Sequence, residues 1–169
     1  MGSPLLEVND LRIAFPVEGR MTEAVRGTSF SLDQGEVVGL LGESGSGKSV
    51  SALAIMGLIA PPGAITAGTI WFNGRDLRTL NEAALRKVRG REISIVFQDP
   101  QTTFNPSLTI GSQLLHVIRT HTSRTKAEAK KRALEVLELV GLPHPSRVMR
   151  CYPHQLSGGM RQRTSIGMA

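Results

Sequence analysis

A glycine-rich segment that ends in lysine and serine is the part of this sequence best suited to chemistry. Residues 42–49 read Gly-Glu-Ser-Gly-Ser-Gly-Lys-Ser and fit the pattern G-x-x-x-x-G-K-[ST]. Glycines let such a loop curl so that its backbone N–H groups point at phosphate oxygens. Lys48 would place a positive charge on the β- and γ-phosphates, and the Ser49 hydroxyl would bind Mg²⁺. The segment predicts a phosphate-binding loop, the alternative being a glycine-rich turn that binds nothing.

The elements on either side of the loop decide whether it can work. The apolar run Val37–Leu41 predicts a strand buried on both faces, as in a parallel sheet. A helix is expected from Lys48 to about Leu58, where Pro61-Pro62-Gly63 stops it. The N-terminus of that helix would add its partial positive charge to the phosphate site. Kinases, GTPases, helicases and transporters all carry such a loop, so the loop alone does not name a function.

The rest of the chain divides into a strand-rich front half and a helical back half. Asn73-Gly74 is a strong turn signal, and Gly141 is a good helix stop. The expected strands are Leu5–Phe15, as an edge strand, and Thr28–Leu32, Thr69–Phe72 and Ile93–Phe97, the last of them buried. The expected helices are Glu82–Val88, Ile110–Arg119, Lys126–Val140 and one that starts near Ser157.

The amino-acid composition argues against a nucleic-acid partner and against a membrane-spanning segment. The formal charge is +6, but lysines and arginines are mixed with acids along the chain, which is typical of solvated helix faces. Aromatic residues make up 4 %, too few for a base-stacking surface, so no nucleic-acid partner is expected. No apolar run approaches the length of a membrane span, and the N-terminus does not read as a signal peptide. The single cysteine, Cys151, cannot form an internal disulfide.

A second motif lies near the end of the chain. Leu156 is followed by Ser157, Gly158, Gly159 and Met160. Ser157 is suited to cap a helix, and the two glycines would let a backbone come close to a ligand. The motif therefore predicts another helix N-terminus ready to receive an anion, although Ser-Gly-Gly alone also fits an ordinary capped helix.

With these two motifs, the sequence as a whole resembles the ATP-binding subunits of ABC transporters. Residues 156–160 match the LSGGQ signature of that family, with Met160 in place of glutamine. Gln98 stands where the family has its Q-loop glutamine, and Phe15 where an aromatic ring stacks on adenine. The patterns Gln98-Asp99-Pro100, Phe104-Asn105-Pro106 and Tyr152-Pro153-His154-Gln155 look like the oligopeptide and dipeptide importers, whose pattern nickel and glutathione importers share.

The resemblance implies an α/β P-loop NTPase fold, incomplete at its C-terminus. Residues 1–98 would hold the front of a RecA-like core with an antiparallel β subdomain. Residues 99–155 would form an α-helical subdomain, and residues 156–169 the signature and the start of its helix. The implied ATP-binding residues are Phe15, Gly42, Glu43, Ser44, Gly45, Ser46, Gly47, Lys48, Ser49 and Val50.

The resemblance also implies a mechanism for a whole subunit. Lys48 and Gln98 would act in hydrolysis, Ser49 and Gln98 would bind Mg²⁺, and Ser157–Met160 would contact ATP held by a second ATP-binding subunit, paired head to tail. Transmembrane permease subunits and an external substrate-binding protein would complete the assembly, at the cytoplasmic face of the cell membrane. In the family, the region after the Q-loop glutamine contacts the membrane subunits, and here it contains Phe104 and Leu108. These two side chains either serve that contact or pack beneath their loop.

Three family features are not found in these 169 residues: the Walker B strand with its aspartate, the catalytic glutamate and the switch histidine. His116, His121, His144 and His154 are not in the place of the switch histidine. We therefore interpret the chain as the front part of a longer ATPase subunit and expect it to be inactive alone. The alternatives are a soluble ABC-type ATPase not coupled to transport and a non-hydrolytic nucleotide binder.

Overall fold

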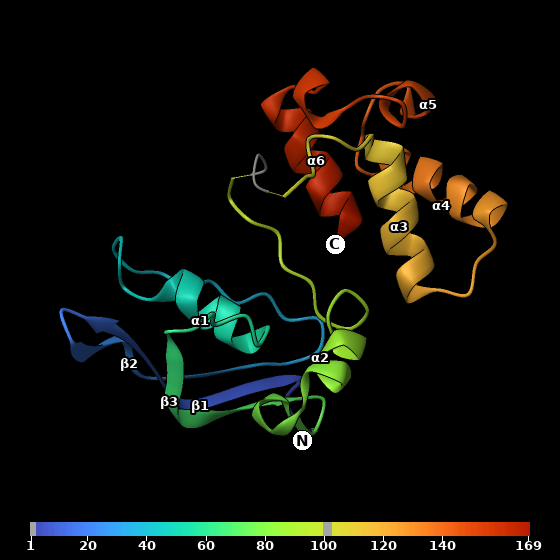
Figure 1. Cartoon of the computed structure of the whole chain (residues 1–169). Coiled ribbons are helices and arrows are strands. Elements are labelled where there is room, and N and C mark those ends of the chain that lie inside the picture. The colour runs from blue at the N-terminus through green and yellow to red at the C-terminus, as the bar shows by residue number, and fades with distance from the viewer. Residues whose placement is uncertain (1–2, 100–102) are drawn as a thin grey trace. The chain divides into compact units, whose positions relative to one another are not determined.

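The computed structural model describes residues 3–99 and 103–169 and divides into two units (Figure 1). The units are Met1–Arg89 and Gly90–Ala169, and each is described by itself. Pro100, part of the pattern after Gln98, lies outside the described residues. The boundaries after residues 98 and 155 that the family resemblance implies stay a prediction.

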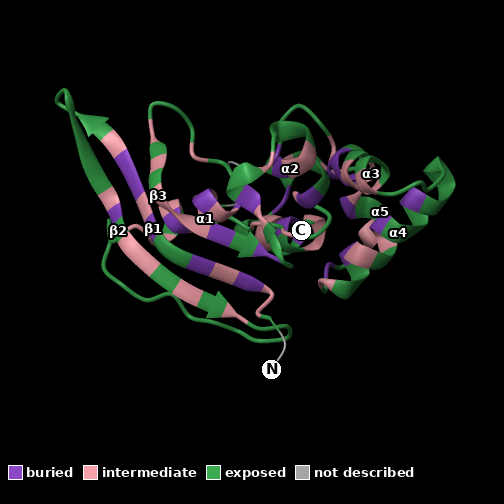
Figure 2. Ribbon diagram, turned by 90° about the horizontal axis from the view of Figure 1, so that it is seen from below, coloured by how far each residue is buried: buried purple, intermediate pink, exposed green. Residues whose placement is uncertain are grey.

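The first unit is built on a four-stranded antiparallel sheet. The strands are β1 (Leu6–Val17), β2 (Arg20–Leu32), β3 (Ala64–Phe72) and β4 (Arg75–Asp76), in the order β2-β1-β3-β4. Val8, Leu11 and Ile13 of β1 are fully buried, and α1 (Lys48–Ile55) packs on β1 and β2 (Figure 2). The expected edge strand Leu5–Phe15 is therefore an interior strand, because β2 and β3 pair with both of its sides.

Short sequence motifs correctly predicted a turn and a helix in the second half of this unit. Asn73 and Gly74 both have positive φ, 48° and 73°, and close a hairpin in which Trp71 pairs with Asp76. A 3-10 helix, η1 (Leu77–Thr79), and α2 (Glu82–Val88) follow. Asn81 caps α2 by accepting from the backbone N–H of Ala84. The predicted turn and the predicted helix Glu82–Val88 are confirmed.

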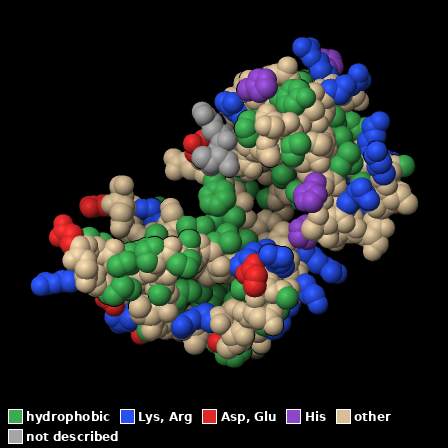
Figure 3. Space-filling view, in the orientation of Figure 1, with side chains coloured by type: hydrophobic (Ala, Val, Ile, Leu, Met, Phe, Trp, Pro, Cys, Tyr) green, Lys and Arg blue, Asp and Glu red, His purple; other side chains and the backbone are tan. Residues whose placement is uncertain are grey.

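Two predicted strands are wrong. Residues 37–41 belong to no strand, and Val37 and Leu41 are each 95 % exposed. Ile93–Phe97 forms no strand beyond an isolated bridge at Ile93, and Val96 and Phe97 are exposed. A buried strand needs neighbours on both sides for its backbone and its side chains, and no described strand pairs with either segment. Hydrophobic side chains consequently lie at the surface (Figure 3).

The second unit is helical, as predicted. It contains α3 (Ile110–His121), α4 (Lys126–Leu139), α5 (Pro145–Val148), the 3-10 helix η2 (Pro153–Gln155) and α6 (Gly158–Met168). Gly141 has a φ of 69° and follows the end of α4, which fits its predicted role as a helix stop. None of the described helices is long and apolar enough to cross a membrane. A buried hydrophobic cluster packs within the described part of this unit: Phe104, Ile110, Leu114, Ala133, Leu137, Leu142, Val148 and Leu156.

Candidate nucleotide-binding site

The predicted phosphate loop curls around the ammonium group of its own lysine. Lys48 Nζ donates to the carbonyl oxygens of Gly42 and Glu43, each at 2.7 Å, and lies 3.2 Å from Ser46 Oγ. A turn closes the loop where the Ser46 N–H donates to the Glu43 carbonyl oxygen at 3.2 Å. Within the described part of the chain, the ammonium is held by neutral oxygens, and the anionic oxygens of a phosphate would attract it more strongly.

Helix α1 begins directly at this loop. Gly47 stands at its N-cap with a φ of 90°, and no side chain caps the helix. The first N–H groups of an α-helix have no acceptor within the helix, so those of α1 are available to an anion. A Cβ atom at position 47 would lie 2.7 Å from the Ala24 carbonyl oxygen, so only glycine fits this close approach to β2. Ser49, predicted as a Mg²⁺ ligand, is exposed and lies in the first turn of α1.

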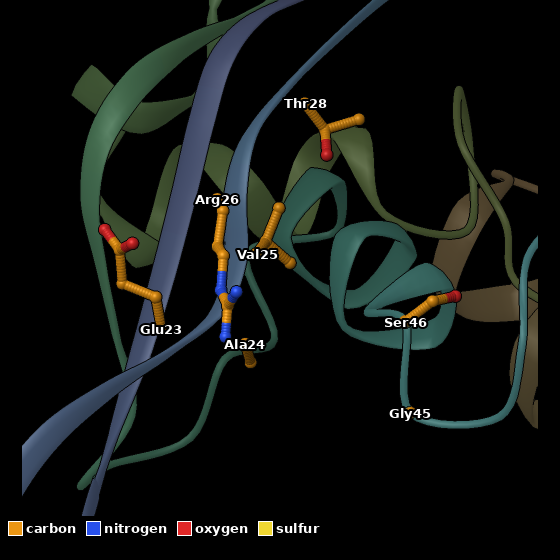
Figure 4. A pocket seen from close by; sticks show the side chains of 7 residues that line it. All are labelled: Glu23, Ala24, Val25, Arg26, Thr28, Gly45 and Ser46. Carbon is orange, nitrogen blue, oxygen red and sulfur yellow. The ribbon is translucent and has the colours of Figure 1, made fainter.

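A mostly polar cavity of about 380 Å³ lies between β2 and the loop. Figure 4 shows β2 lining one side of it and the loop residues Gly45 and Ser46 the other. The residues from β2 are Glu23, Ala24, Val25, Arg26 and Thr28. Sequence reasoning missed them because no motif marks them: β2 is about 20 residues from the loop in the chain, and only sheet pairing and the contact at Gly47 bring it close.

Phe15 lies near the end of β1 and is half-buried. Its ring lies against the backbone of Gly63, where an added Cβ would come within 2.3 Å of the ring. One part of the ring thus packs within the unit while the rest remains accessible. Stacking on adenine and packing in the core were the two interpretations of Phe15, and the first stays a prediction.

The other predicted site residues lie in the second unit. Gln98 is exposed, in a segment without regular secondary structure. Ser157 caps α6 by accepting from the Met160 N–H at 3.3 Å, as predicted. Gly158 and Gly159 are exposed, and an added Cβ at either position would meet no atom within 4 Å. Tight internal packing therefore does not explain these glycines. They leave the backbone at the N-terminus of α6 exposed to solvent.

The segment after Gln98 is anchored by two buried side chains. Phe104 is only 5 % exposed and belongs to the core of the second unit, so it packs beneath its loop and is not a surface contact. Gln113 is 8 % exposed; it accepts from the Asn105 N–H at 2.9 Å and donates to the carbonyl oxygens of Asn105 and Leu108 at 3.1 and 3.0 Å. Leu108 is 46 % exposed and is the apolar side chain that this loop presents to solvent.

The chain is similar to known transport ATP-binding proteins over nearly all of its length. The oligopeptide transport ATP-binding protein OppD of Bacillus subtilis is 51 % identical over 166 residues, which are 98 % of this chain and 46 % of the relative. The dipeptide transport ATP-binding protein DppD of Escherichia coli is 48 % identical, over 98 % of this chain and 50 % of the relative. The chain thus spans about half the length of these curated relatives.

Solved structures and a family profile agree with this similarity. The dimeric structure of the ATP-binding cassette MJ0796, in a post-hydrolysis state bound to ADP and Pi, matches with a TM-score of 0.85 at 27 % identity. The match covers 96 % of this chain and 68 % of that cassette. The fold is therefore that of a P-loop ATP-binding cassette, as far as the chain extends. Because the profile described as "ABC transporter" matches residues 25–169, the chain belongs to the ABC transporter family.

Proposed function

We propose that the full-length protein is the ATP-binding subunit of an ABC importer, most suited to peptides, in which ATP binding and hydrolysis drive uptake. The observation that carries the proposal is the loop at α1, with the Lys48 ammonium held across it at a helix N-terminus. The names of the relatives, which are oligopeptide and dipeptide transport ATP-binding proteins, support peptides as the substrate class.

In the proposed site, some residues would bind the nucleotide and others would stabilise the charge that develops during hydrolysis. Lys48 would leave the carbonyl oxygens of the loop and bind the β- and γ-phosphates, stabilising negative charge as the phosphoryl group transfers. The N–H groups at the start of α1 would bind phosphate oxygens. Phe15 would stack on adenine. Gln98 would bind the attacking water and respond to the γ-phosphate.

The donor set fits Mg²⁺ bound together with a nucleotide. The described residues contain no group of three or more His, Cys, Asp or Glu side chains that could hold a metal by themselves. Mg²⁺ usually takes one or two protein oxygens and completes its shell with phosphates and water, and Ser49 with Gln98 would supply the protein oxygens. The ion would neutralise phosphate charge when it is bound.

The partners follow from the same reasoning. The related MJ0796 cassette is a dimer, which supports a head-to-tail pair of subunits in which Ser157–Met160 of each contacts the nucleotide of the other. Permease subunits and an external binding protein would complete the importer, with this subunit at the cytoplasmic face of the membrane. Closing and opening of the pair of ATP-binding subunits would then drive the membrane subunits between inward-facing and outward-facing states.

Replacement of Lys48 by alanine in the full-length protein tests the proposal. Losing a charge-assisted contact costs about 1.5–3 kcal/mol, so Mg-ATP should bind roughly ten- to a hundredfold more weakly in calorimetry, and uptake of a labelled dipeptide should cease. Lys87→Ala, an exposed lysine on α2, is the matched control and should change neither. Equal ATP affinity of the wild type and Lys48→Ala would refute the phosphate-loop assignment.

We also infer that residues 1–169 alone bind Mg-ATP but do not turn it over, because no carboxylate in them is placed as a general base after the signature. Phosphate release by this fragment should equal that of its Lys48→Ala variant. Clear turnover above that variant would contradict the inference and direct attention to Glu43 or Asp99.

A further inference from the structure

The net charge of the chain is confined to its helical half. Residues 90–169 hold 11 of the 20 lysines and arginines but only 5 of the 14 acids, a formal charge of +6 that equals the charge of the whole chain. The sheet-containing unit is therefore neutral. A charge this unevenly distributed produces a local positive field on one unit rather than a uniform one.

Within the helical unit the positive charge gathers around the connection between α3 and α4. Figure 3 shows lysines and arginines over the part of the unit that carries these two helices. We call this cluster the basic tip; its residues are Arg119, Arg124, Lys126, Lys130, Lys131 and Arg132.

The acids near the basic tip are already engaged. Glu128 accepts from the N–H and hydroxyl of Thr125 at 2.8 and 2.7 Å in a capping box, and Glu135 pairs with Arg132 at 3.6 Å. Within residues 3–99 and 103–169, Arg119 and Lys126 form no ion pair. These two cations are therefore free to bind an external anion.

Arg119 and Lys126 also line a groove. The groove has a volume of about 380 Å³ and runs along the exposed side of α3 to the start of α4; its residues are Ser112, Leu115, His116, Arg119, Thr120 and Lys126. Leu115 is half-buried and is its apolar lining residue, while Arg119 and Lys126 are exposed. A concave site of this kind receives a side chain, with polar contacts around it.

The shape of the groove and its side chains favour one of three kinds of anionic partner: a membrane surface, a nucleic acid or an acidic protein segment. A bilayer surface is too broad and flat to enter a concave groove, and interfacial binding depends on large exposed apolar side chains, whereas the one large aliphatic residue among the described lining residues, Leu115, is half-buried. Single-stranded nucleic acid is bound on aromatic platforms, and no Phe, Tyr or Trp is among the described residues that line the groove. An acidic protein segment fits both features, since an apolar side chain can lie on Leu115 while neighbouring carboxylates meet Arg119 and Lys126.

We propose that this groove is a docking site for an acidic protein segment that carries an apolar anchor residue. The site is separate from the residues of the nucleotide loop and the signature, and it does not depend on the proposed function. A partner bound there would contact α3 and the start of α4, the two helices that contribute half of the residues of the buried cluster of this unit.

The test uses the full-length protein and a short labelled peptide of glutamates around one central leucine, followed by fluorescence anisotropy. The double variant Arg119→Glu/Lys126→Glu should bind this peptide at least roughly tenfold more weakly, because two attractive contacts become repulsive. A peptide with serine in place of the leucine should also bind more weakly. Unchanged circular dichroism and Mg-ATP affinity would show that the double variant is folded.

The matched control is Arg147→Glu/Arg150→Glu, which makes the same change in charge on exposed positions of the same unit outside the groove. It should leave peptide binding nearly intact. Equal losses in both double variants would show a general charge effect and overturn the proposal. So would the absence of peptide binding, or groove-dependent binding of duplex DNA or phosphatidylglycerol vesicles in place of the peptide.

Discussion

Gln113 should control the stiffness of the loop that follows Gln98. Its buried amide makes three hydrogen bonds to the backbone of Asn105 and Leu108. At about 0.5–1.5 kcal/mol each, these bonds would sum to about 1.5–4.5 kcal/mol. Asn105 and Leu108 are exposed, so water can replace part of what is lost. For Gln113→Leu, which keeps the volume but removes the amide, we therefore expect a loss of about 1.5–2 kcal/mol in local stability.

Hydrogen exchange in the full-length protein measures this loss directly. The Asn105 N–H donates to Gln113 Oε1, so its exchange should accelerate at least roughly tenfold in Gln113→Leu, since about 1.4 kcal/mol corresponds to a factor of ten. Ser112→Ala, on the neighbouring exposed residue, is the control and should leave the Asn105 amide unchanged. If a folded Gln113→Leu protein kept the wild-type exchange rate at Asn105, the amide would not be what holds this loop.

Three further predictions concern the site, the helical unit and the membrane contact. Phe15→Ala should weaken Mg-ATP binding roughly tenfold in calorimetry with the fold intact; unfolding without a specific binding loss would assign Phe15 to the core. The hydroxyl and N–H of Thr125, with a nearby arginine, lower the pKa of Glu128 below its ordinary 4.5. That stabilisation is complete above pH 4.5 and is lost as the pH falls through the lower folded value. Thr125→Ala should therefore cost about 1 kcal/mol in urea unfolding at neutral pH and less in acid; an equal cost at both pH values would contradict this. In the full-length protein, Leu108→Asp should reduce assembly with the proposed permease subunits, whereas Phe104→Asp should unfold the helical unit; normal assembly of Leu108→Asp would remove it from that surface.

The parts of the fold that depend on neighbouring residues were predictable from the sequence. The Asn73-Gly74 hairpin, the capped helix after Asn81 and the glycine stop at Gly141 are set by backbone conformations that only a few residue types adopt readily. The strand predicted at Val37–Leu41 depends instead on partners far away in the sequence. An apolar run reports a preference for burial, and it cannot report whether another strand is present to cover it.

In the candidate site, too, features set by neighbouring residues were predictable and features set by distant residues were not. The phosphate loop is continuous in sequence, so its pattern predicted correctly that α1 begins at Lys48. Glu23 and Arg26 reach the cavity through the pairing of β2 with β1 and the close approach at Gly47, and no local pattern records either contact. The burial of Phe104 was open for the same reason, because an apolar residue in a loop is equally consistent with a surface contact and with packing underneath.

The shared core of the helical unit has a mechanical consequence. Phe104, six residues beyond Gln98, and Leu156, which immediately precedes the signature serine, belong to one buried cluster. Interiors of this kind are close-packed, so neither side chain can shift far without leaving a void that costs about 1 kcal/mol or more. The segment after Gln98 and the segment before the signature, about 50 residues apart in the sequence, are thus anchored in one rigid core. A displacement imposed on either segment would therefore move this core as a rigid body and would not be absorbed along the chain between the two segments.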